Sequence, residues 1–94
     1  MRTHPLVRSL KAIFPDVEFT LKLSLDWCSM TFAGQKVMIE GIAPGWLSIE
    51  RSLKTLPEHE FSIPNLLVAD IAATTLENDE GRIAILIEAV VIDE

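Results

Sequence analysis

Two acidic residues interrupt otherwise apolar runs near the end of the chain, Asp70 in the run 66–76 and Glu88 in the run 83–92. Two carboxylates that lie close together in partly apolar surroundings can share a proton, as a general acid–base pair does. The alternative is that both face solvent or meet an arginine or lysine from a helix or a second subunit. We favour the structural role, because close carboxylates also occur in structural networks and neither run contains a catalytic motif.

His59 lies between two acids, Glu58 and Glu60, which makes it a candidate metal ligand. Adjacent side chains in an extended segment point to opposite sides, so His59 cannot share a ligand cluster with both glutamates. The chain has one other histidine, His4, and one cysteine, Cys28, which is a poor supply of metal ligands. We therefore predict a hydrated loop histidine, no metal and no other cofactor.

Trp46 and Cys28 are two further candidates. Trp46 follows Gly45 and could line a ligand pocket, but such residues more often fill the core beneath a helix. Cys28 lacks the local signature of a nucleophile, and cysteines in strands are commonly small buried apolar residues. We expect both side chains to belong to the core.

The last third of the chain is predicted to form a β-hairpin. Two β-rich runs flank the turn cluster 77–81, which ends in a glycine that can adopt positive φ. With a loop of three or five residues the strand partners share parity, which groups the odd-numbered positions on one face. These positions are Leu67, Ala69, Ile71, Ala73, Thr75, Ile83, Ile85, Ile87, Ala89 and Val91. The even face, which carries Asp70 and Glu88, is also mostly apolar, so both faces should be covered.

Two short helices are predicted. The first has Thr3 as N-cap and Pro5 in its first turn, and it ends at Pro15. The second ends at Pro57 and has an apolar stripe at helical spacing. The stripe consists of Trp46, Ile49, Leu53 and Leu56.

A second hairpin is predicted between the two helices. From Glu18 the apolar period changes to two, which indicates a half-buried strand that continues, bent or bulged near 26–28, to Phe32. A turn at 33–35 then leads into a return strand at 37–42. The chain is therefore predicted to be a single α+β domain, in which two short helices pack on one face of a four-stranded, mainly antiparallel sheet in the order α-β-β-α-β-β.

The composition is that of a folded domain, with 49% hydrophobic and 23% charged residues. A chain of 94 residues buries only about 60 to 65% of its unfolded surface, so its stability depends on a good core or on a partner subunit. One cysteine excludes an intrachain disulfide, and no stretch has the length of a membrane span. We expect a soluble, cytoplasmic protein that does not bind a membrane.

Charge is unevenly distributed along the chain. Residues 1–54 hold seven Lys/Arg and five Asp/Glu, whereas residues 55–94 hold one and nine. Nucleic-acid binding needs a basic face, which the sequence does not provide. The acidic half could engage a basic protein partner, although net charge of this kind more often serves the solubility of an acidic bacterial-type protein.

These observations favour a small non-enzymatic interaction domain that self-associates, as a homodimer, through its C-terminal hairpin. One alternative is a ligand-binding or enzymatic domain with a pocket near Trp46, Asp70 and Glu88. The other is an acidic inhibitor or immunity-type protein that caps a basic partner.

Overall fold

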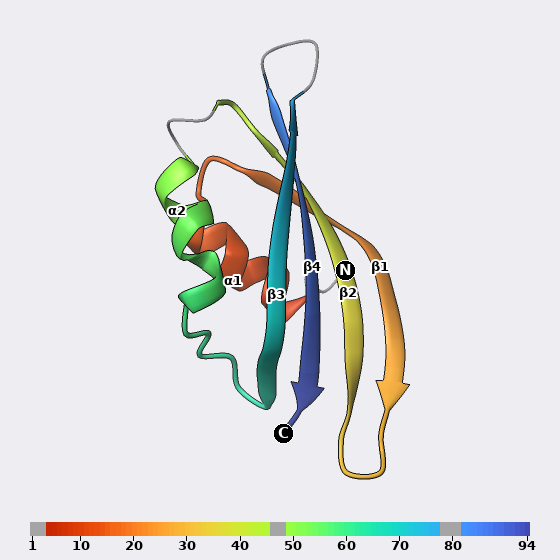
Figure 1. Cartoon of the computed structure of the whole chain (residues 1–94). Coiled ribbons are helices and arrows are strands. Elements are labelled where there is room, and N and C mark those ends of the chain that lie inside the picture. Colours follow the sequence, from red (N-terminus) through yellow and green to blue (C-terminus); the bar gives the residue numbers. More distant parts are fainter. Residues whose placement is uncertain (1–3, 46–48, 78–81) are drawn as a thin grey trace.

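The computed structural model describes residues 4–45, 49–77 and 82–94, and it has the predicted α+β fold (Figure 1). The described elements are α1 (Pro5–Ile13), β1 (Glu18–Cys28), β2 (Ala33–Ala43), α2 (Glu50–Thr55), the 3-10 turn η1 (Leu56–Glu58), β3 (Leu66–Glu77) and β4 (Ile83–Asp93). The four strands form one antiparallel sheet in the order β1-β2-β4-β3. Both helices lie on the same side of this sheet (Figure 1).

The chain consists of two halves with the same architecture. Each half is a helix followed by a hairpin, and the two hairpins join through β2 and β4, which pair antiparallel at the centre of the sheet. The halves are therefore related by an approximate two-fold axis that passes between β2 and β4, although their sequences show no repeat. The edge strands are β1 and β3.

The core lies between the helices and one face of the two central strands. From Val37 in β2 and throughout β4 up to Val91, the odd-numbered residues are buried and the even-numbered ones are exposed or half-buried, as a strand covered on one face requires. The fully buried larger side chains are Leu6, Leu10, Phe14, Val17, Val37, Ile39, Ile49, Leu56, Ile83, Ile85, Ile87 and Val91. The odd positions of β4 are thus the main core surface, as predicted.

The parity predicted for the C-terminal hairpin holds over most of its length. Ile71 pairs with Ala89, and the strands are joined by a five-residue connection between Glu77 and Ile83. A register shift between Val68 and Asp70 makes Ala69 a bulge residue and exchanges the two faces towards the start of β3.

The placement of Leu67 and Ala69 on the core face was therefore wrong. Leu67 pairs with Ile92 on the opposite face and is 48% exposed. Leu66 and Val68 pack against the core in their place.

A similar correction applies to β1, whose bulge lies at Lys22 rather than near 26–28. Before the bulge Phe19 faces the helices and packs against the core, but after it Leu23, Leu25 and Trp27 point to the other face. β1 is therefore an edge strand with apolar residues on both faces, not a strand with one apolar and one wet face.

The turn between β1 and β2 lies at 29–32 instead of 33–35. The Ser29 hydroxyl accepts a hydrogen bond from the backbone N–H of Phe32 at 3.1 Å, and the Ser29 N–H donates to the Phe32 carbonyl at 2.7 Å. Gly34 lies within β2, where a Cβ atom would overlap the carbonyl oxygen of Val91. This glycine permits close approach of two strands and does not form a turn.

The two helices lie where they were predicted, with different ends. The N-cap of α1 is His4, whose Nδ1 accepts from the Leu6 N–H at 3.1 Å, and Thr3 lies outside the described residues. α2 has six residues and continues into η1, and its exposed side carries Glu50, Arg51 and Lys54 as expected.

We predict that Ile87→Ala lowers the free energy of unfolding by about 2 to 5 kcal/mol, the range for deleting most of a buried isoleucine. Ile87 is fully buried. Lys54→Ala is the control, and as a change of an exposed side chain it should alter the same quantity by less than about 0.5 kcal/mol. Urea denaturation of both variants measures these differences. A loss for Lys54→Ala as large as for Ile87→Ala would mean that α2 is rotated from its described position.

Candidate functional site

The candidate site is the face of the sheet that the helices leave uncovered, which we call the open face. Strand register arranges its side chains in rows that cross β1, β2, β4 and β3 in turn. Four rows are Trp27-Gly34-Ile92-Leu67, Leu25-Lys36-Val90-Asp70, Leu23-Met38-Glu88-Ala72 and Thr20-Glu40-Leu86-Thr74. The open face therefore brings together residues from both halves of the chain.

Apolar side chains dominate this face although no helix covers it. Leu23 is 42% exposed, Leu25 52% and Leu67 48%. Met38, Leu86, Val90, Ile92 and Trp27 are half-buried. The indole N–H of Trp27 is buried and has no hydrogen-bond partner in the described part of the chain. Contiguous exposed apolar side chains of this kind are uncommon on monomeric proteins, which makes the open face the candidate site.

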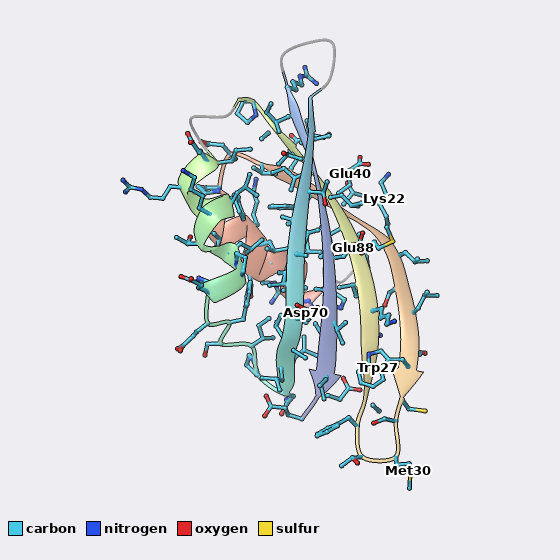
Figure 2. All side chains as sticks on the ribbon, viewed as in Figure 1. Lys22, Trp27, Met30, Glu40, Asp70 and Glu88 are labelled. Atoms are coloured by element: carbon cyan, nitrogen blue, oxygen red, sulfur yellow. The ribbon has the colours of Figure 1, made fainter. Side chains whose placement is uncertain are left out.

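Three charged side chains lie near the middle of the open face, and within the described residues they form no ion pair. They are Lys36 on β2, Glu88 on β4 and Asp70 on β3, and all three are exposed. By contrast, Lys22 and Glu40 pair with each other at 3.9 Å, on the side of Glu88 away from Lys36 (Figure 2).

The structure places Asp70 and Glu88 on the same face, as the sequence predicted. Asp70 lies opposite Val90 and Glu88 opposite Ala72, so the two carboxylates occupy diagonal positions on adjacent strands. With Lys36 they border a groove of about 300 Å³ whose other walls are largely apolar. The groove could hold a partner's side chain or a small molecule, but it contains no histidine, hydroxyl or thiol that could act as a nucleophile.

The other sequence candidates do not join this site. His59 lies between η1 and β3 and does not line the groove. Its ring packs edge to face on the ring of Phe61, with 4.7 Å between the ring centroids. Trp46 falls outside the described residues. Cys28 is exposed, which contradicts its expected place in the core. The reason is that the β1–β2 hairpin extends beyond the helices, and Cys28 lies near its tip (Figure 1).

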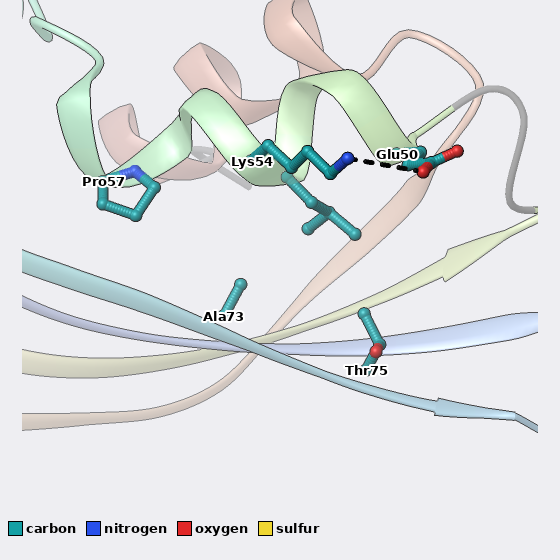
Figure 3. A pocket seen from close by; sticks show the side chains of 6 residues that line it. Glu50, Lys54, Pro57, Ala73 and Thr75 are labelled. Carbon is teal, nitrogen blue, oxygen red and sulfur yellow. Dashed lines mark ion pairs between the residues drawn. The ribbon is translucent and has the colours of Figure 1, made fainter.

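A second groove, of about 500 Å³, lies between α2 and β3 (Figure 3). It is lined by Glu50, Leu53, Lys54, Pro57, Ala73 and Thr75. Its two charged residues, Lys54 and Glu50, pair with each other at 3.6 Å. The other described lining residues, Leu53, Pro57, Ala73 and Thr75, carry no titratable group, so the described part of this groove offers packing but no evident chemistry.

Sequence reasoning missed several residues of the open face, among them Lys36, Leu23, Leu25, Trp27 and Leu67. Alternation along β1 indicated that its leucines share one face, but it could not show that a bulge turns that face away from the helices. Lys36 lay next to a segment interpreted as a turn. The sequence showed only that Lys36 is a charged residue directly before the run of alternating apolar residues at 37–42.

No group of three or more histidine, cysteine or acidic side chains placed to hold a metal ion occurs among residues 4–45, 49–77 and 82–94. Within those ranges no helix has the length and apolar character needed to cross a membrane. Comparisons of the chain with protein-family models, with curated proteins and with solved structures gave no match.

We predict that Asp70→Asn and Glu88→Gln each change the free energy of unfolding of the single chain by less than about 0.5 kcal/mol, as exposed substitutions usually do. The reason is that neither carboxylate has a cation or hydrogen-bond donor to lose among the described residues. Thermal melts at concentrations low enough to keep the protein monomeric measure the effect. Stabilisation by about 1 kcal/mol or more would reveal a strained pair of carboxylates and would support the acid–base hypothesis.

Proposed function

We propose that the protein is a small non-enzymatic interaction domain that forms a homodimer by packing the open face of one copy on that of another. The observation that carries this proposal is the set of exposed apolar side chains on the open face, Leu23, Leu25 and Leu67, which no described helix covers. A monomeric protein of 10.5 kDa is expected to expose about 5,400 Å². This chain exposes 6570 Å², an excess of roughly 1,100 Å² over that expectation.

The excess belongs to the whole of an elongated chain, whose extents are 45 × 24 × 22 Å. A stable dimer buries about 800 Å² on each partner. Four strands of about eleven residues, spaced about 4.8 Å apart and rising about 3.3 Å per residue, present a surface of roughly 700 Å² on one face. This area lies in the lower part of the range of about 600 to 1,000 Å² that standard interfaces bury on each partner. Packing of two sheets also suits a chain whose sheet is already covered by helices on the other side.

The edges of the sheet are less suitable for association. A strand added to an edge needs an unbroken row of backbone hydrogen-bonding groups, and a bulge interrupts that row. Both edge strands carry a bulge, at Lys22 in β1 and at Ala69 in β3. These features favour association through the face rather than through an edge.

A small ligand is the second candidate, because the groove beside Asp70 and Glu88 has a volume of about 300 Å³. Such a ligand would cover the middle of the open face and leave the row of Trp27 and Leu67 exposed. A strongly basic partner protein would meet Lys36 near the centre of the surface. A second copy accounts for more of the surface than either of these.

The dimer proposal predicts a molecular mass of two chains in sedimentation equilibrium at about 100 µM, well above the micromolar dissociation constants that interfaces of this size reach at their weakest. Leu25→Glu should yield a monomer, because it places a carboxylate within the apolar contact without changing the core.

Leu21→Glu is the matched control, since Leu21 lies on the same strand, pairs with Ile39 on the helix-covered face and is 38% exposed. It should remain dimeric, with thermal melts establishing that both variants are folded. A wild-type protein that sediments as a single chain under these conditions would refute the proposal.

A further inference from the structure

The geometry points to one arrangement of the dimer, in which a two-fold axis runs parallel to the strands between β2 and β4, and Lys36 of each copy pairs with Asp70 and Glu88 of the other. This inference rests on the proposed function, and it specifies how the second copy binds. It is carried by the distribution of charge on the open face.

The positive and negative charges lie on different halves of the sheet. Lys36 is on β2, whereas Glu88 and Asp70 are on β4 and β3. No ion pair joins these three groups within the described residues. A face-to-face contact removes water from them, and burying a charge without a partner is strongly unfavourable. A contact that brings each charge close to one of opposite sign on the second copy offsets this cost.

A two-fold axis parallel to the strands satisfies this requirement. It places β1 and β2 of one copy over β3 and β4 of the second copy. Each row then faces the same row of the second copy, with the order of the strands reversed. Lys36 then lies over Val90 of the second copy, with Asp70 one strand to the side and Glu88 two residues along. Sheets packed about 10 Å apart with strands about 4.8 Å apart keep both carboxylates within reach of a lysine's four-carbon stem. Its three N–H donors can serve both.

The end of the face fits the same arrangement. Trp27 would pack on Leu67 of the second copy, and Ile92 would lie over the strand position of Gly34. In the row Trp27-Gly34-Ile92-Leu67, the two-fold axis reverses the order of the second copy, so that each residue faces the one at the mirrored position in the row.

A two-fold axis perpendicular to the strands gives a poorer contact. If it passes through the row of Met38 and Glu88, it places the two copies of Glu88 opposite each other and leaves Asp70 opposite Thr74. Facing like charges are costly in an interface. Lys36 would then meet Glu40, which is already paired with Lys22 at 3.9 Å.

The test is to convert the homodimer into a heterodimer by exchanging the charges. One variant carries Lys36→Glu, so its homodimer would contain only acids at each site. The other carries Asp70→Lys and Glu88→Lys, so its homodimer would contain only cations. Each variant alone should dimerise at least about tenfold more weakly than the wild type, because like charges oppose contact. In a mixture both sites are complementary, so a one-to-one heterodimer should form with an affinity within about tenfold of the wild type.

Sedimentation of each variant and of the mixture, with native mass spectrometry to identify the pairing, gives the result. A mixture that stays monomeric while the wild type is a dimer overturns the axis and leaves the proposed function intact. A monomeric wild type overturns both. If the double variant fails to fold in thermal melts, Asp70→Lys with Glu88→Gln replaces it, with the same expected pairing, because this variant also leaves no acid at the site. A wild-type dimer that the Lys36→Glu substitution does not weaken would also overturn the inference.

Discussion

A four-stranded sheet has two faces, and this chain has enough helix to cover only one of them. α1 has nine residues and α2 has six, and both pack on the side where β2 and β4 bury their odd-numbered residues. The even-numbered residues of those central strands are mostly apolar as well, because the strands follow the pattern of a sheet buried on both faces. Among the described residues no helix covers the second face, and this is the basis for the proposal that a second copy does so.

The two bulges affect both the apolar surface of the open face and the free edges of the sheet. Each lies in an edge strand, Lys22 in β1 and Ala69 in β3, at comparable places in the two halves. They turn Leu23, Leu25 and Leu67 towards the open face, where they enlarge the apolar surface. They also interrupt the backbone hydrogen-bonding groups along both free edges, which opposes the addition of further strands. The two bulges thus add apolar area to the open face and make the edge strands poorer partners for pairing with another strand.

The order of elements, the shared parity of β3 and β4 and the core role of the odd face followed from the sequence, because they depend on periodicity and on turn residues that act locally. The bulges did not, since Lys22 and Ala69 are ordinary strand residues and alternation continues on both sides of them. Gly34 was interpreted as part of a turn, but the reason for a glycine there is the carbonyl of Val91, a contact between residues far apart in the chain. Asp70 and Glu88 were correctly placed on one face, whereas Lys36 could be joined to them only once β2 and β4 were known to be neighbours.

The charges on the open face bear on specificity more than on affinity. An entirely apolar face would adhere to any exposed sheet, in any orientation, and would promote aggregation. Lys36, Asp70 and Glu88 lose hydration in every contact, and only an arrangement that pairs them offsets this loss. They therefore weaken the wrong contacts more than the right one, which is how partners and orientations are distinguished. Since a partner that binds only the folded chain also stabilises it, selection of one orientation would stabilise the 94-residue domain itself. On this view the charges specify the contact, and the apolar rows around them provide its driving force.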